Sequence, residues 1–267
     1  MDRSFVWAHG RIVPPEKRAL WASFRPYAFE VYPRELFDPK NYSPAEAAEL
    51  RALAEQEERY NDLDYENSFR AFLYDGEDRR GLEERLVRIN FLGRAVTVHR
   101  IIRDALLRID NALTSESRTD AELKRFIDSL APIGAYNWRR VRGGRSLSYH
   151  SWGLALDLQR QQRETKAVYW QWEKDRNSNW IFIPLEDRWQ PPEKVIQAFE
   201  YEGFIWGGKW LFFDTMHFEY RPELHEINRL LAAREGDSRI VSPRNDAAIH
   251  HIVPQVVDVQ NFWRAWF

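Results

Sequence analysis

No cysteine occurs among the 267 residues of this chain. Disulfide bonds, thiol catalysis and a zinc site with sulfur ligands are therefore excluded. The absence of cysteine does not identify the compartment, because a cysteine-free protein suits the cytosol and the periplasm equally. A zinc site in this protein would need histidine and carboxylate ligands instead.

Long apolar runs are missing as well. A membrane-spanning helix needs roughly 18 consecutive apolar residues, and no stretch of this chain is that apolar over such a length, so we expect no transmembrane segment. The first residues, M-D-R-S-F-V-W-A-H-G-R, contain no apolar core of the length found in signal peptides. Either the protein does not use that export route, or the chain is a mature form with an added start residue. The sequence leaves both possibilities open.

Neither sign of charge is in clear excess, since 39 lysines and arginines face 41 aspartates and glutamates. Nucleic-acid binding by counterion release needs a concentrated basic face, so we expect no nucleic-acid partner. The members of one local basic cluster are Arg139, Arg140, Arg142 and Arg145. For all of these arginines except Arg139, a functional basic cluster and an ordinary solvated loop are equally good interpretations. The sequence does not indicate the oligomeric state.

Hydrophobic residues make up 44% of the chain and include 12 Trp, 11 Tyr and 16 Phe, which is ample for a sizeable core. Helical patterns precede Gly134 and short extended runs follow it, an order typical of α+β proteins. We predict a small antiparallel sheet flanked by helices. The predicted segments are an N-terminal arm and helical extension over 1–88, a central domain over 89–236 and a C-terminal tail over 237–267 that packs on the body.

Capping patterns and apolar periodicity predict the helices. Ser43 and Glu46 form a capping box at the start of a helix over 43–60. Apolar residues at three- and four-residue spacing predict a second helix over 98–113. Further helices are expected to begin at Thr119 and at Pro191, the second of them closed by Gly203 as a left-handed cap. A last helix is expected over 222–234. Extended structure is expected at 154–159 and 210–220, and residues 160–190 are expected to form a long excursion or hairpin around 180–184. Residues 1–42 show no clear period and are expected to form an irregular arm.

Two aromatic segments contain the residues that indicate chemistry. His150 and Asp157 lie in S-L-S-Y-H-S-W-G-L-A-L-D-L, and Asp214 and His217 lie in W-G-G-K-W-L-F-F-D-T-M-H-F-E-Y-R-P-E-L. Two imidazoles and one carboxylate are a ligand set for catalytic zinc, which leaves its fourth position to water. Asp214 would then be a base near that water.

Spacing alone does not establish such a site. A His and an Asp seven residues apart, or the pattern D-x-x-H, also occur at ordinary surface and core positions. The aromatic and glycine-rich surroundings favour a site, because polar groups buried in such runs need partners. Strand geometry adds two expectations, since side chains alternate between faces. A turn at Gly153 would let His150 approach Asp157, and a bend near Asp214 would bring its carboxylate beside His217 without making it a ligand.

The stretch N-W-R-R-V-R-G-G-R-S-L-S-Y-H-S-W-G-L-A-L-D-L, followed by G-F-I-W-G-G-K-W-L-F-F-D-T-M-H-F-E-Y-R-P-E-L, resembles a family of zinc peptidases. This is the D-alanyl-D-alanine carboxypeptidase (VanY-type) family, which belongs to the superfamily of lysostaphin-type enzymes and the Hedgehog signalling domain. The similarity rests on S-x-H-x-x-G-x-A-x-D, W-G-G-x-W and D-x-M-H-F-E, and it covers about residues 90–225.

The resemblance implies a role for each motif residue. Zinc would be bound by His150, Asp157 and His217, with Asp214 as general base and Arg139 as the arginine that binds a substrate carboxylate or carbonyl. Supporting or substrate-binding positions would be Ser148, Trp210 and Glu219. Glu219 is interpreted equally well as a surface acid at a strand edge. Residues 89–236 would form the catalytic domain.

The implied activity is zinc-dependent hydrolysis of peptidoglycan stem peptides, first of all as a D-alanyl-D-alanine carboxypeptidase. Some relatives carry Glu at the base position, and Asp214 resembles the branch of L-alanyl-D-glutamate endopeptidases and phage lysins. A non-catalytic zinc-bearing domain that binds the cell wall is a further alternative. The expected location is the cell envelope, periplasmic or extracellular, because the substrate lies there.

Overall fold

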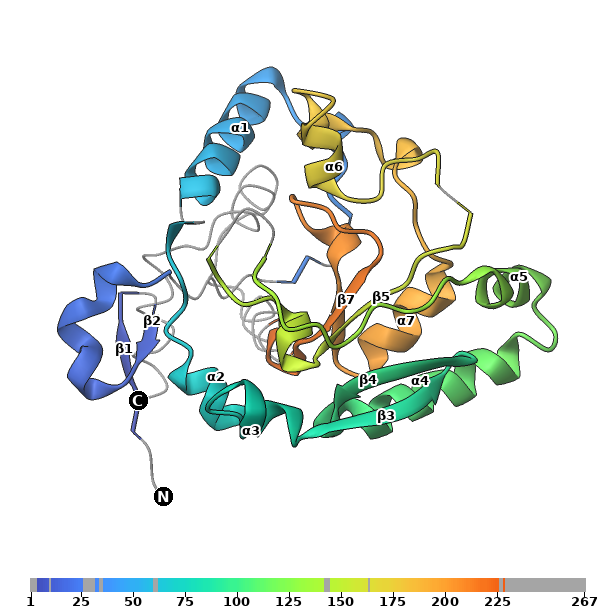
Figure 1. Cartoon of the computed structure of the whole chain (residues 1–267). Coiled ribbons are helices and arrows are strands. Elements are labelled where there is room, and N and C mark those ends of the chain that lie inside the picture. The colour runs from blue at the N-terminus through green and yellow to red at the C-terminus, as the bar shows by residue number, and fades with distance from the viewer. Residues whose placement is uncertain are drawn as a thin grey trace, which may run out of the picture.

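The structure is a computed structural model, and it describes residues 4–9, 11–25, 32–33, 36–59, 62–141, 145–162, 164–225 and 228. Figure 1 shows two β-hairpins and a central sheet with helices packed around them. The predicted α+β class is confirmed. Within the described residues, no helix has both the length and the apolar character needed to cross a membrane.

Every strand pairing in these sheets is antiparallel. The hairpins join β1 (Val6–Ala8) to β2 (Arg11–Val13) and β3 (Leu86–Phe91) to β4 (Arg94–His99). The central sheet has the order β5-β7-β6, with the bounds Ala155–Asp157 for β5, His217–Tyr220 for β7 and Phe204–Trp206 for β6. Strand β7 therefore has hydrogen-bonded neighbours on both edges.

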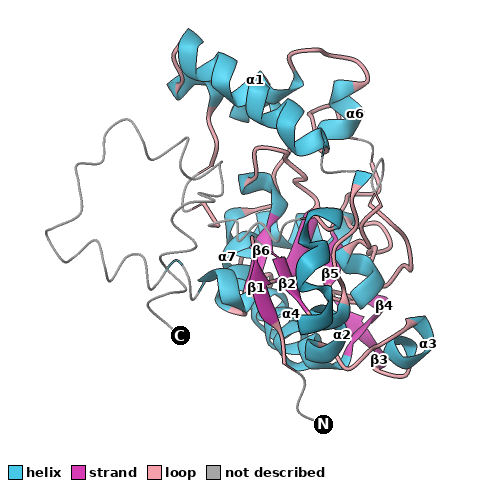
Figure 2. Ribbon diagram, turned by 90° about the vertical axis from the view of Figure 1, so that its left-hand side faces the viewer, coloured by secondary structure: helices cyan, strands magenta, loops and turns pink. Residues whose placement is uncertain are grey.

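The helices are arranged around the sheets (Figure 1). Their bounds are α1 Pro44–Arg59, α2 Ser68–Leu73, α3 Arg79–Glu83, α4 Arg103–Glu116, α5 Ala121–Ser129, α6 Trp170–Lys174 and α7 Glu193–Tyr201. Figure 2 shows α1 and α6 together at one end of the molecule. The side chain of Arg51 on α1 reaches Asn179 at 2.8 Å, just beyond α6.

The main core lies between α4, α7 and the sheets. Phe199 of α7 stacks on Phe218 of β7 with ring centroids 4.2 Å apart, and it meets Phe91 of β3 edge to face. Ile109 and Leu113 of α4 are almost fully buried in the same cluster. Because Phe218 faces this core, its neighbours His217 and Glu219 face the opposite side of β7.

Two helix predictions are confirmed with their caps. The backbone N–H of Ser43 donates to Glu46 Oε2 at 2.7 Å, and the Glu46 N–H donates back to Ser43 Oγ at 3.4 Å. Helix α7 follows Pro192, as predicted, and buries Val195, Ile196 and Phe199. Gly203 ends this segment with φ +88°, a left-handed conformation that glycine adopts without strain.

The helix predicted over 98–113 begins later than expected. Val98 belongs to β4, Ile101 is 50% exposed, and α4 begins at Arg103. The difference arises because β4 continues pairing with β3 through His99. The His99 imidazole then accepts a hydrogen bond from the Ile101 N–H at 3.2 Å and caps a short 3-10 turn. Apolar spacing at the end of a strand had resembled the first turn of the helix.

Other boundaries differ for local reasons. Asp120, and not Thr119, caps α5 through hydrogen bonds from the N–H groups of Glu122 and Leu123. At the excursion or hairpin predicted around 180–184, the chain forms a 3-10 turn over Trp180–Phe182, where Trp180 packs on Trp170. Of the run 210–220, the part that pairs as a strand is β7.

The ends of the chain are only partly described. Residues 1–42 include the β1–β2 hairpin and a 3-10 segment over Pro15–Ser23, so the prediction of an irregular arm there was wrong. Most of the helix predicted over 222–234 and the whole tail over 237–267 lie outside the described residues. The division of the chain at residues 88 and 236 stays a prediction.

Candidate metal centre and its surroundings

The pairing of β5 with β7 brings two of the predicted ligands together. Asp157 is directly opposite His217 in the antiparallel ladder. Side chains of directly opposed residues lie on the same face of a sheet, and Asp157 Oδ1 lies 2.9 Å from His217 Nδ1. Two residues that are 60 positions apart in the sequence thus share one site.

The third candidate, His150, is carried by a 3-10 turn over Tyr149–Trp152. The Ser148 hydroxyl caps this turn by accepting the His150 N–H at 3.3 Å. Gly153 ends it with φ +65°, so the turn expected at this glycine is present. A Cβ at Gly153 would lie 2.7 Å from the His99 backbone nitrogen, so a larger residue does not fit. The turn places His150 Nε2 at 3.2 Å from Asp157 Oδ1.

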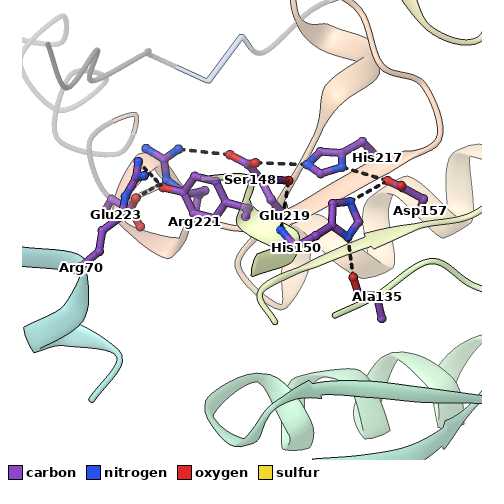
Figure 3. A network of polar contacts seen from close by, with 10 residues as sticks. Arg70, Ala135, Ser148, His150, Asp157, His217, Glu219, Arg221 and Glu223 are labelled. Atoms are coloured by element: carbon purple, nitrogen blue, oxygen red, sulfur yellow. Dashed lines mark hydrogen bonds and ion pairs between the residues drawn. The ribbon is translucent and has the colours of Figure 1, made fainter. Parts of the chain in front are cut away.

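The three side chains form a compact cluster of potential metal ligands, shown in Figure 3. One donor atom each from His150, Asp157 and His217 lies within 4.8 Å of the others. The two histidines are 2% and 8% exposed. The outer nitrogen of each imidazole is also engaged: His150 Nδ1 lies 2.7 Å from the Ala135 carbonyl oxygen, and His217 Nε2 lies 3.1 Å from Glu219 Oε2.

These outer contacts determine which ring nitrogen carries hydrogen. A carbonyl or carboxylate oxygen only accepts, so His150 donates through Nδ1 and His217 donates through Nε2. In the neutral tautomers, the lone pairs then lie on His150 Nε2 and His217 Nδ1, the two atoms that face Asp157. This is the orientation that metal-ligating histidines adopt.

The electrostatics of the cluster favour a positive charge. Burial acts to raise the pKa of Asp157, but hydrogen bonds with His150 and His217 outweigh it and hold the pKa well below its usual value. Burial acts to lower the pKa of His217, yet Asp157 and Glu219 raise it well above the usual value. A divalent cation bound among these side chains would supply that positive charge.

Asp214 lies at the predicted bend. The His217 N–H donates to the Asp214 carbonyl oxygen at 3.1 Å, and the Asp214 N–H donates to the Gly207 carbonyl oxygen at 3.0 Å. Its Oδ1 is buried and has no hydrogen-bond partner among the described residues. Burial raises the pKa of Asp214 to about 7, with His217 opposing and Asp157 adding to the shift. Asp214 is not one of the three clustered ligands.

Arg139 is held through its backbone. Its N–H donates to Ser151 Oγ at 2.9 Å, and the Ser148 N–H donates to its carbonyl oxygen at 3.1 Å. The guanidinium is exposed and forms no ion pair or hydrogen bond with the residues that the structure describes. Its charge acts to lower the pKa of Asp214.

Ser151 is fully buried, and its hydroxyl hydrogen-bonds only to backbone atoms of Asn137 and Arg139 among the described residues. This residue was missed in the sequence because backbone partners leave no sequence pattern.

Trp210 follows the W-G-G turn and lies beside the cluster. Its ring centroid is 5.6 Å from that of His217. The two glycines are needed for close approach: a Cβ at Gly207 would lie 2.6 Å from the Asp214 carbonyl oxygen, and one at Gly208 would lie 2.1 Å from the Trp206 ring. The motif thus lets the turn fold tightly against the bend at Asp214.

Glu219 is 6% exposed, which disagrees with the interpretation as a surface acid. Its carboxylate lies between His217 Nε2 at 3.1 Å and Arg221 Nη1 at 3.1 Å. Arg221 was also missed in the sequence, although it lies within the aromatic motif. An arginine two residues beyond a strand acid is common on protein surfaces, so no local pattern distinguishes it.

The donor set fits a divalent metal. Two imidazole nitrogens and a carboxylate oxygen are ligands that suit zinc. The buried Oδ1 of Asp214 has no hydrogen-bond partner in the part of the chain that the structure describes, as expected for a group that would bond to a water molecule or substrate. The identity of the ion does not follow from these residues alone.

Comparison with known proteins supports the same chemistry. Residues 142–220 match the family described as D-alanyl-D-alanine carboxypeptidase. The three clustered ligands and Asp214 lie within that range, whereas Arg139 precedes it. No curated protein and no solved structure matches the chain. The family match supports a peptidase, and the His-Asp-His cluster supports a potential metal site in it.

Proposed function

We propose that this protein is a zinc-dependent peptidase that removes the terminal residue from D-alanyl-D-alanine ends of peptidoglycan stem peptides. The observation that carries the proposal is the buried His150–Asp157–His217 cluster with Asp214 beside it, inside the segment that matches a carboxypeptidase family. The cell envelope is the location that this substrate implies.

The metal would be held by His150 Nε2, Asp157 Oδ1 and His217 Nδ1. When bound, zinc would act as a Lewis acid that polarises the scissile carbonyl and lowers the pKa of its bound water from about 16 to about 7. Glu219 and the Ala135 carbonyl orient the two imidazoles from behind.

Asp214 would be the general base. Its carboxylate accepts a proton from the attacking water while the water oxygen bonds to the carbonyl carbon. The same group returns the proton to the leaving amine as the peptide C–N bond breaks, so the products are a shortened peptide and free D-alanine. A base works best when its pKa lies near the working pH. In the metal-free protein, burial raises the pKa of Asp214 to about 7.

Arg139 would bind the terminal carboxylate of the substrate. A guanidinium offers two parallel N–H donors that match a carboxylate, which an ammonium cannot do. The exposed Arg139 side chain has no competing acid partner within the described residues, so its donors are available. The hydrogen bonds of the Arg139 backbone to Ser148 and Ser151, on either side of His150, support a position close to the site.

Endopeptidase action on an L-alanyl-D-glutamate bond is a second candidate. It is favoured by the aspartate at position 214, because the endopeptidase branch of the resembling family carries Asp there. A non-catalytic zinc-bearing domain is disfavoured, since it would require neither Asp214 nor Arg139.

The test is mass spectrometry of defined stem peptides after incubation with zinc-loaded protein, with His150→Ala as the control. Loss of one terminal alanine supports the carboxypeptidase, and release of a fragment that begins at D-glutamate supports the endopeptidase. No cleavage by protein with a full equivalent of zinc would reject both and favour the binding domain.

A further inference from the structure

Arg221 contacts both segments that carry the histidine ligands, although it does not touch the ligands themselves. Its Nη1 donates to Glu219 Oε1 at 3.1 Å, next to His217 on β7. Its guanidinium carbon also lies 5.1 Å from the centroid of the Tyr149 ring, and Tyr149 immediately precedes His150. Figure 3 shows Arg221 between Glu223 and Glu219, in the row of contacts that continues through His217 to Asp157.

The contact with Glu219 gives that carboxylate a partner for each oxygen. Oε2 accepts from His217 and Oε1 accepts from Arg221, each at 3.1 Å. The Glu219 and Arg221 side chains are 8% and 13% exposed, so solvent screens the pair weakly. A guanidinium is always charged, and it therefore holds Glu219 as an acceptor that keeps the hydrogen on His217 Nε2.

The contact with Tyr149 reaches the other ligand. The Tyr149 ring lies against two guanidinium groups, with Arg221 at 5.1 Å and Arg70 of α2 at 4.9 Å. Arg70 also donates to the Tyr149 hydroxyl at 3.3 Å. Cations over an aromatic face are attracted to it. The start of the His150 turn is therefore held by two positive charges, Arg70 on α2 and Arg221 just after β7.

We propose that Arg221 is a positioning residue that fixes the two imidazole ligands relative to each other by bridging Glu219 and Tyr149. The inference rests on the proposed metal site and deepens it. Without Arg221, a buried carboxylate oxygen would lose its partner, and one side of the Tyr149 ring would lose its packing. Both histidines would then sample orientations that bind metal less well. A lysine keeps the charge but cannot bond to Glu219 and cover the Tyr149 ring as a flat guanidinium does.

The test measures metal binding directly. Zinc affinity is determined by competition with a chromophoric chelator, and the visible absorption spectrum is recorded with cobalt(II), for the wild type, Arg221→Met and Arg221→Lys. Contacts behind a metal ligand typically contribute about tenfold to hundredfold in affinity. We expect Arg221→Met to weaken zinc binding by about tenfold or more, with an altered cobalt spectrum, and Arg221→Lys to lie between it and the wild type.

Two control variants separate this role from loss of an ordinary ion pair. Arg108→Met removes an arginine that pairs through two nitrogens with Glu202, on a side chain that is 61% exposed. Glu223→Gln removes the other acid that contacts Arg221, while the Glu219 contact can remain. Both controls should bind zinc within about twofold of the wild type, since neither touches a group that contacts a ligand.

The outcomes distinguish the inference from the proposed function. Wild-type protein that binds neither ion would overturn both. Wild-type protein that binds zinc, together with a folded Arg221→Met variant of equal affinity and unchanged cobalt spectrum, would overturn only the role of Arg221. If Arg221→Met does not fold, Arg221→Lys decides, and equality with the wild type in both measurements would overturn the inference.

Discussion

Asp157 and His217 face each other across the β5–β7 ladder, with Oδ1 and Nδ1 2.9 Å apart. The candidate metal centre is therefore a product of strand register. A shift of one residue in the pairing would turn one of the two side chains to the opposite face of the sheet. The buried Phe218 opposes such a shift, because it would be moved out of the core.

Zinc should stabilise the folded protein, because the three ligands come together only when the chain is folded. A ligand at a hundredfold excess over its Kd adds about 2.7 kcal/mol to the free energy of unfolding. Thermal unfolding with zinc and with a chelator measures this difference. Asp157→Asn should show a much smaller difference. A wild-type Tm that zinc leaves unchanged would contradict the metal site.

Asp214→Asn should lose activity but keep the metal. Loss of a general base typically costs about 10²–10⁴ in kcat, whereas the three clustered ligands are untouched. The measurements are kcat on a cleaved stem peptide and zinc affinity of the same preparation. A large loss of zinc affinity would instead identify Asp214 as a ligand.

The buried Asp214 should also make stability depend on pH in protein kept free of metal by a chelator. Its pKa in the folded protein is about 7, above the ordinary value of 3.8. The folded protein then binds more protons at this group than the unfolded chain between those values, so its contribution to stability falls as pH rises through the window.

The matching measurement compares urea unfolding of the wild type and Asp214→Asn. The free energy of unfolding of the variant, relative to the wild type, should increase between about pH 4 and pH 7.5, since the variant cannot ionise at this position. Groups common to both proteins cancel in the comparison. A constant difference across this range would show that Asp214 has an ordinary pKa.

Arg139→Lys should reduce kcat/KM by about tenfold to hundredfold on peptides with a free terminal carboxylate, because a hydrogen bond to a charged group contributes about 1.5–3 kcal/mol. Peptides with an amidated end should be poor substrates for the wild type, and Arg139→Lys should change them little. Equal losses on both kinds of peptide would place Arg139 elsewhere in the reaction.

Gly153→Ala and Gly93→Ala form a matched pair for the turn that carries His150. Both glycines have positive φ, +65° and +75°, so each substitution costs about 1–2 kcal/mol in backbone strain. At Gly153 the new methyl group would also lie 2.7 Å from the His99 nitrogen, whereas nothing lies within 4 Å at Gly93. Denaturant unfolding should show the larger loss for Gly153→Ala. Equal losses would mean that the neighbours of Gly153 can move aside.

Part of the site could be predicted because it depends on residues close together in the sequence. His150, Gly153 and Asp157 lie within one motif, and strand parity alone indicates the turn between them. The bend at Asp214 follows from the same argument. Arg221 and Ser151 could not be identified in this way, because their roles depend on contacts with segments that are distant in sequence or with backbone atoms.

The fold was predictable where local chemistry was decisive. The Ser43–Glu46 cap determines the start of α1 within a single turn. The start of α4 was not predictable, because Val98 satisfies a helical spacing and a strand pairing equally well, and its partner Val87 decides the outcome. Trp180 likewise packs on Trp170 from a separate turn, a contact that no periodicity encodes.

Strand β7 is enclosed by neighbours on both edges and is largely buried. Its central amides should therefore exchange with solvent deuterium only when the whole domain opens. The imidazole of His217 and the carboxylate of Glu219 project from this protected strand, so their conformational entropy is lost when the chain folds. A cation that arrives later would find its ligands preorganised, and its binding energy would not be spent on ordering them.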